Sequence, residues 1–216
     1  TLQEAPGHTK ALTNLSQISI KNGLLTDLTK FFKSLNEAHP NNVELGIAYA
    51  KSLAIQKQYS ESLAIVKQFS SSDLFNENHL MLMADLYLID KDLNSAKQTF
   101  EKVLNTNDRN FSAVLRLSGI YELEGEYQKG IKLVDSAMKF QPNNSTLLMI
   151  KANFQMKSRD KSGAEESLEK LANTRVNHVF AQQLQGDMAM ANKLPHKAID
   201  FYSNVYEKKP VGINAI

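Results

Sequence analysis

Histidine is the residue of this sequence best able to bind a metal or carry a proton, and its spacing argues against both roles. Zinc sites gather roughly four ligands, which often come as closely spaced pairs. No two histidines of this chain lie within helical reach of each other. We therefore predict no metal site, and we expect each histidine to be solvated. The histidines are His8, His39, His79, His178 and His196.

Glutamates are the other candidates for chemistry, and they are grouped as Glu165–Glu166 and as Glu122, Glu124 and Glu126. Adjacent residues of a helix point apart, so solvated faces explain these groups. The sequence has no phosphate-binding glycine-rich loop, nucleophile elbow or zinc-protease motif. It also has no cysteine, which excludes disulfides and thiol catalysis. We therefore predict no enzyme activity and no cofactor. A segment that positions substrate for a catalytic domain elsewhere stays an alternative.

The charge balance indicates which partners to expect. Lysine and arginine number 25 and aspartate and glutamate 23, so the formal net charge is +2. A nucleic-acid-binding domain carries a basic stripe, whereas the arginines here are few and scattered. No apolar run approaches the roughly 20 residues that span a bilayer. We therefore predict a protein partner, with no nucleic acid and no transmembrane segment in this chain.

The elements that would position a binding surface follow from a fixed period along the chain. Pro6 and Pro40 are one period apart, Pro142 follows three periods later, and Pro210 two periods after that. A period of this size, about 34 residues, is typical of stacked helical hairpins. We predict one array over residues 1–216, with partial repeats at 1–8 and 213–216. The predicted full repeats are 9–42, 43–76, 77–110, 111–144, 145–178 and 179–212.

Small residues recur at two places in these blocks, where we expect the two helices of a hairpin to cross. Helices pack closely only where neither carries bulk at the crossing. Glycine recurs at block position 15, where Gly23 and Gly125 suit the turn between the helices. Position 8 holds Ser16, Ala50, Ala84, Ser118, Ala152 and Gly186. Position 20 holds Ser62, Ala96, Gly130, Ala164 and Ala198, and the first block departs from the pattern with Leu28.

The pattern resembles the tetratricopeptide repeat (TPR). The fourth block matches best, through Leu117, Ser118, Tyr121, Gly125, Tyr127, Gly130, Ala137 and Pro142. Departures include Gly46 and Gln182 in place of a large residue at position 4. The resemblance implies an all-α, right-handed solenoid superhelix of six antiparallel helix pairs. Such arrays generally provide a surface for binding rather than a pocket for catalysis.

The resemblance also implies where a partner would bind, because the first helix of each TPR lines a concave groove. Apolar and charged residues mix at these positions, and four of the seven methionines of the chain are among them. Methionine is common on surfaces that fit varied apolar partners, so we predict binding of an amphipathic peptide or helix. Packing against a neighbouring repeat is an equally good explanation of the apolar members. The predicted groove residues are Ile47, Lys51, Ile55, Met81, Leu82, Asp85, Leu88, Ile89, Leu115, Arg116, Glu122, Met149, Asn153, Met156, Asp187 and Met190.

The ends of the sequence suggest a cellular context and a second hypothesis. The segment Ala5–His8, followed by a leucine-rich helix, resembles bacterial TPR lipoproteins of the exosortase system. That resemblance implies a periplasmic or membrane-anchored protein of an envelope, secretion or polysaccharide-export assembly. Neither end resembles a polar capping helix, so we expect a piece of a longer protein. Uncapped ends also suggest a homo-oligomer, in which the array associates with a copy of itself.

Overall fold

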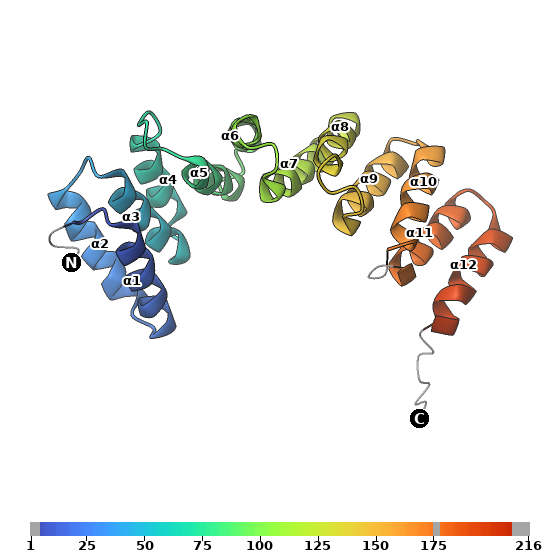
Figure 1. The fold of residues 1–216 in the computed structure, drawn as a ribbon, viewed down its shortest axis with the longest axis horizontal. Helices are drawn as coiled ribbons and strands as arrows, with labels where there is room; N and C mark the ends of the chain where they lie inside the picture. The colour runs from blue at the N-terminus through green and yellow to red at the C-terminus, as the bar shows by residue number, and fades with distance from the viewer. Residues whose placement is uncertain (1–4, 175–177, 209–216) are drawn as a thin grey trace, which may run out of the picture. The chain divides into compact units, whose positions relative to one another are not determined.

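The computed structural model describes residues 5–174 and 178–208, which form helices, turns and loops without a strand (Figure 1). The predicted all-α helical-repeat fold is confirmed. The expected partial repeat at 213–216 lies outside the described residues, as do the first four residues of the other. The helices are α1 (Thr9–Lys21), α2 (Leu25–Ala38), α3 (Val43–Ile55), α4 (Tyr59–Gln68), α5 (Glu77–Ile89), α6 (Leu93–Thr106), α7 (Phe111–Glu124), α8 (Tyr127–Met138), α9 (Ser145–Lys157), α10 (Lys161–Ala172), α11 (His178–Ala191) and α12 (Pro195–Lys208).

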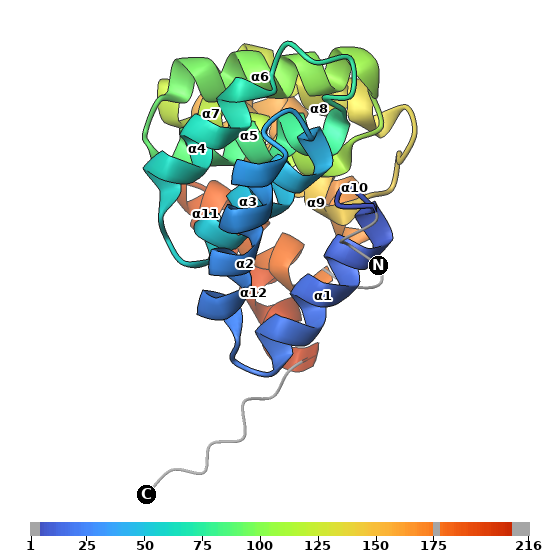
Figure 2. The same cartoon turned by 90° about the vertical axis from the view of Figure 1, so that its left-hand side faces the viewer.

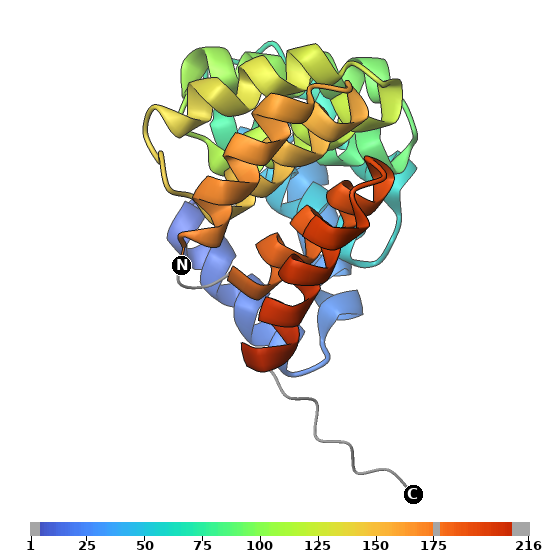
Figure 3. The same cartoon turned by 90° about the vertical axis from the view of Figure 1, so that its right-hand side faces the viewer.

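Two compact units divide the chain, at Thr1–Ala113 and Val114–Ile216. In the first unit, α1–α2, α3–α4 and α5–α6 are hairpins, and each of α2 and α4 also contacts the odd-numbered helix that follows it (Figure 2). In the second unit, α9 packs between α8 and α10, and α11 packs between α10 and α12 (Figure 3). Odd-numbered helices are called A helices below, and even-numbered ones B helices. A single continuous array stays a prediction.

Asparagine starts four of the A helices, always at the last position of the preceding block. The side chain of Asn42 accepts the Leu45 N–H at 3.1 Å at the start of α3, and Asn144 accepts two N–H groups of α9. Asn76 and Asn110 do the same for α5 and α7. Each side chain satisfies backbone donors that have no partner inside the helix. In α1, the Nδ1 atom of His8 takes this role by accepting the Ala11 N–H at 3.2 Å.

The small residues at positions 8 and 20 lie where the hairpin helices approach each other. Ala50, Ala84 and Ala152 are fully buried at position 8 of their repeats. In the second repeat the two positions touch, because the hydroxyl of Ser62 donates to the Ala50 carbonyl at 2.7 Å. Tight helix crossing therefore depends on this pair of positions.

Gly46 departs from the TPR pattern without weakening its hairpin. A large residue is usual at this position of the repeat. In its absence, the ring of Phe69 from the end of α4 fills the space over the Gly46 backbone. Phe69 is buried and belongs to the core cluster around Ala50 and Val66. A side chain of the B helix thus fills the space that a large side chain of the A helix would otherwise occupy.

Position 15 adopts a left-handed backbone conformation in every repeat. Glycine holds it at Gly23 and Gly125, with φ of 72° and 70°, as the sequence predicts. The other four repeats use a cation, at Lys57, Lys91, Arg159 and Lys193, with φ between 59° and 64°. A residue with a Cβ is strained there, and a cation just beyond the C-terminus of a helix recovers part of that cost through the helix dipole.

We predict that Lys91→Gly raises the stability of the chain. Glycine removes the left-handed strain of about 1–2 kcal/mol, and the flexibility it adds to the unfolded chain offsets roughly half of this gain. The expected result is a higher midpoint in urea unfolding. Lys102→Gly, at an exposed position inside α6, should instead lower the free energy of unfolding by about 1 kcal/mol. A lower midpoint for Lys91→Gly would contradict the prediction.

Candidate functional site

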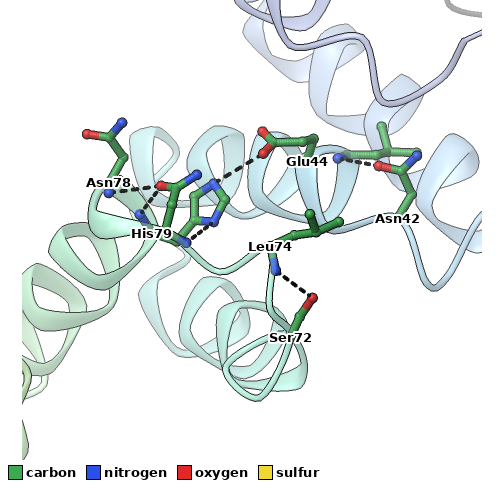
Figure 4. Close-up of polar contacts among 8 residues, drawn as sticks. Asn42, Glu44, Ser72, Leu74, Asn78 and His79 are labelled. Atoms are coloured by element: carbon green, nitrogen blue, oxygen red, sulfur yellow. Dashed lines mark hydrogen bonds and ion pairs between the residues drawn. The ribbon is translucent and has the colours of Figure 1, made fainter. Parts of the chain in front are cut away.

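The structure corrects the prediction for His79, which is buried with 2% of its surface exposed. Its Nδ1 atom accepts the Asn76 N–H at 3.3 Å, while the Asn76 side chain accepts the His79 N–H, so the two form a capping box. The Nε2 atom lies 3.8 Å from Glu44 (Figure 4). Because Nδ1 accepts a hydrogen bond, the ring proton of the neutral form is on Nε2, on the side of Glu44. His79 is therefore a structural residue of the α3–α5 contact.

His79 should make the stability of the chain depend on pH below neutrality. Burial lowers its pKa, and Lys51 adds to this effect, although Glu44 opposes it. The unfolded chain, with a histidine pKa of about 6.5, therefore takes up this proton before the folded chain does. Above that value His79 is neutral in both states and contributes no pH dependence. Below it, the free energy of unfolding falls as the pH falls.

The measurement is urea unfolding at about pH 7.5 and about pH 5.5, on either side of the histidine pKa. His79→Gln keeps an acceptor for the capping box but cannot titrate, so it should lose less stability on acidification than the native chain. Equal acid sensitivity of His79→Gln and the native chain would contradict this role.

The first unit contains a hollow of about 200 Å³ between α1 and α3. The predicted groove residues Lys51 and Ile55 line it and are exposed, together with Ile20 and Gln17 of α1. Ile47 also borders it but is only 1% exposed and belongs to the core. Of the two explanations that the sequence left open, packing therefore accounts for Ile47.

The remaining groove residues of the first unit lie on α5. Met81, Leu82, Asp85 and Leu88 are half-buried, and Ile89 at the end of the helix is exposed. Leu82 packs against the core cluster that joins α3, α4 and α5. These residues are thus partly engaged in packing, with some surface left for a partner.

In the second unit, polar groove residues bond to each other across neighbouring A helices. One carboxylate oxygen of Glu122, on α7, accepts the Asn153 amide at 2.8 Å and the Lys157 ammonium at 2.6 Å, both on α9. These bonds lower the pKa of Glu122, and the same carboxylate raises the pKa of Lys157. The network fixes the charges on this face. Leu115 is half-buried and Arg116 exposed on the same α7.

Two apolar groove residues of the second unit, Met149 and Met156, line hollows between α9 and α11. The smaller, of about 230 Å³, is bordered by Met149, Ile150, Asn153, Met156 and Leu184. The larger, of about 600 Å³, has Met156 and Leu184 on its wall as well. The shared residues show that the two hollows are neighbours on one face. The other residues that line the larger hollow are Arg159, Lys161, Asp187, Met188 and Asn192.

Asp187 and Met190 are the groove residues placed on α11. One carboxylate oxygen of Asp187 accepts the hydroxyl of Tyr202 at 2.7 Å, and this hydrogen bond raises the pKa of that phenol. Met190 is exposed and lines neither hollow between α9 and α11. The predicted groove residues therefore include Met149 and Met156 of the apolar walls but not Ile150, Leu184 or Met188. They also omit the two cations, Arg159 and Lys161. The sequence did contain a signal that singles out Arg159, because a cation recurs at position 15 of the repeats.

Other kinds of site are not seen in the parts of the chain that the structure describes. Within residues 5–174 and 178–208, no three histidine or acidic side chains converge in a way that would hold a metal. Among the helices described, none has the length and apolar character needed to cross a bilayer. The candidate site is therefore the face formed by the A helices within each unit.

Sequence comparison assigns the repeat to a family. The model of the TT21 fifth ARM repeats domain matches residues 77–192, more than half of the chain. The chain belongs to this family. No curated protein matches the sequence significantly. The matched residues hold helices α5 to α11.

Solved structures similar to this member of the TT21 family are TPR proteins. MamA from Desulfovibrio magneticus is 14% identical with a TM-score of 0.66, over 80% of this chain and 97% of MamA. A TPR protein from Parabacteroides merdae is 18% identical with a TM-score of 0.58, over 99% and 83% of the two chains. YrrB, described as a TPR protein with an unusual peptide-binding site, is 11% identical with a TM-score of 0.67, over 85% and 94%. At these identities the likeness concerns the fold, and it confirms the predicted TPR resemblance.

Proposed function

We propose that the chain is a non-catalytic scaffold that binds a protein segment along the inner faces of its A helices. The observation that carries the proposal is the α9–α11 face, where Met149, Met156 and Leu184 border two adjoining hollows. Adjoining apolar hollows edged by polar groups suit an amphipathic helix laid into a groove. The peptide-binding site named for YrrB, which shares the fold, supports the same function.

The test compares partner capture by the native chain with capture by the triple variant Met81→Asp, Met149→Asp and Met156→Asp. Carboxylates on the A-helix faces of the two units should reduce capture of a defined set of proteins at least about tenfold, since each desolvated charge opposes binding. Circular dichroism verifies that the helices are retained. The control places Asp at Gln68, Gln98 and Ser136, which are exposed on B helices. Unchanged capture by the groove variant would remove the groove from the proposal.

The envelope or secretion context rests only on the segment Ala5–His8 and stays a prediction. It requires that the native protein copurify with membranes or be exported. Fractionation of the source cells, with antibodies against this chain, measures this directly. Recovery in the cytoplasm alone would reject the envelope context without affecting the groove proposal.

Self-association is the second candidate function, and the terminal helices favour it. Position 24 is fully buried in the first five repeats, at Phe32, Val66, Phe100, Val134 and Leu168, but Tyr202 of α12 is 36% exposed. Ile199 and Tyr206 of α12 are more exposed still. α12 therefore exposes position 24, which the first five repeats bury, beside the exposed Ile199 and Tyr206.

α1 presents the complementary face. Position 10 is buried in the next four repeats, for instance at Leu86, Ile120 and Phe154, whereas Ile18 of α1 is 59% exposed. Phe154 shows what this position does, because it packs on Gly130 of the preceding B helix. We infer that α1 of one copy packs on α12 of another in the same manner. Such a head-to-tail contact is heterologous and leads to open chains.

Mixing two variants tests this contact. Ile18→Asp disables the α1 face and Tyr206→Asp disables the α12 face, so sedimentation should find each variant monomeric alone. Mixed in equal amounts, they should form a one-to-one dimer, because one intact α1 face meets one intact α12 face. A native chain that stays monomeric at high concentration would contradict the contact. Variants that still associate alone, or that fail to pair when mixed, would also contradict the contact.

A further inference from the structure

The hollows between α9 and α11 have an uneven charge distribution. Met156 and Leu184 form the walls that the two hollows share, and two cations line the larger hollow only. Lys161 is the first residue of α10, and Arg159 lies in the turn before it. The lining of the larger hollow holds these two cations and one carboxylate, Asp187, so its net charge is +1.

Three carboxylates of this region already have partners. One Asp160 oxygen accepts the Gly163 N–H at 3.0 Å and the other accepts the Gln155 amide at 3.3 Å, which fixes that carboxylate at the start of α10. Asp187 accepts the Tyr202 hydroxyl, and Glu122 binds Lys157. Among the residues that the structure describes, the side chains of Arg159 and Lys161 bind no carboxylate. An anionic group on a partner is thus the complement that these cations lack.

We propose that the α9–α11 hollows bind an acidic amphipathic helix, with apolar side chains in the hollows and an acidic residue at the Arg159–Lys161 end. This inference rests on the proposed function and specifies its partner. From Met149 to Met156, both on α9, the face extends about 10 Å, which matches about two turns of a bound helix. The larger hollow falls within the range of roughly 300–1,000 Å³ that is usual for ligand sites.

The proposed partner group is a side-chain carboxylate beside apolar anchors, not the terminal carboxylate of a peptide. The apolar contacts would supply most of the affinity, and the cations would select the partner. Both cations are exposed, so the charge preference should weaken as salt increases. The apolar contribution should persist at the same salt concentrations.

The test uses two labelled synthetic helices of roughly 18 residues, long enough to be helical in water. Both carry leucines on one face, and they differ only in two glutamates or two glutamines at one end. Fluorescence anisotropy with the full chain should show the glutamate peptide binding roughly three- to tenfold more tightly at low salt. With Arg159→Gln and Lys161→Gln together, the two peptides should bind equally.

The matched control is Lys193→Gln, because Lys193 holds the position of Arg159 in the next repeat but lines neither hollow. It should keep the native preference. Met156→Asp should weaken both peptides, with Met149→Asp as a second variant if the first does not fold. Equal binding of the two peptides by the native chain would overturn the charge selection and leave the groove proposal standing. Binding of neither peptide, or binding that Met156→Asp and Met149→Asp leave intact, would overturn both.

Discussion

Phe154→Ala should lower the free energy of unfolding by about 3–5 kcal/mol, the usual cost of removing a buried phenylalanine. Phe154 is 1% exposed on α9, and its ring packs over the backbone of Gly130 on α8. The Tyr127 ring lies beside it, with centroids 6.3 Å apart. Alanine would leave a cavity in the α8–α9 contact that the helices cannot close without shifting. Urea unfolding followed by circular dichroism measures the loss.

Gly130 provides an internal check, because the sign of its substitution should depend on residue 154. A Cβ added at Gly130 would overlap the Phe154 ring, so Gly130→Ala alone should destabilise by about 1–3 kcal/mol. In the Phe154→Ala background the overlap disappears. Gly130→Ala should then stabilise α8 by about 0.5–1 kcal/mol, since alanine favours the helix over glycine. Strict additivity of the two substitutions would show that the residues are not in contact.

Ala84→Phe is the second large effect that we expect, at about 1–3 kcal/mol of destabilisation by overpacking. Ala84 is fully buried on α5, and Ala96, at position 20 of the same repeat, is fully buried on α6. A phenyl ring at this crossing would separate the hairpin helices. Gln98→Phe, at an exposed position of α6, is the matched control and should change stability little. Coincident thermal melts for Ala84→Phe and the native chain would mean that position 8 is not the crossing point.

The helix pairs could be predicted because their cause is repeated along the chain. Small residues at positions 8 and 20 and apolar residues at position 24 recur from block to block, so chance agreement at one block is corrected by the others. Ala50, Ala84 and Phe100 are buried as that pattern requires. Where a block departs from the pattern, as at Gly46, a side chain from the partner helix fills the space.

The same period explains why the prediction for His79 was wrong. His79 was interpreted by residue type, as a polar group that prefers water. Its position, the third of an A helix, is fully buried in neighbouring repeats at Leu45, Ala113 and Leu147. The tertiary contact overrides the residue preference, and the capping box with Asn76 satisfies the ring nitrogen there. Position in the repeat was the better guide.

The candidate groove was less predictable, because a helix face is about 100° wide and an error of one residue moves a side chain from groove to core. Ile47 lies on the core side of that division, whereas Ile55 on the same helix is exposed. Bonds between A helices, such as Glu122 to Lys157, join residues a whole repeat apart and depend on how repeats stack. A single sequence does not determine that stacking to the accuracy of a hydrogen bond.

An asparagine begins each of α3, α5, α7 and α9, so a whole repeat can be lost or duplicated without removing this helix start. Removing residues 77–110 would join Asn76 to Phe111, so the next helix would still start from an asparagine at its usual place. Loss or duplication of one whole block therefore preserves every helix start, whereas a deletion of a few residues destroys one. Arrays of this kind can grow and shrink by whole blocks, with each copy later free to acquire its own surface.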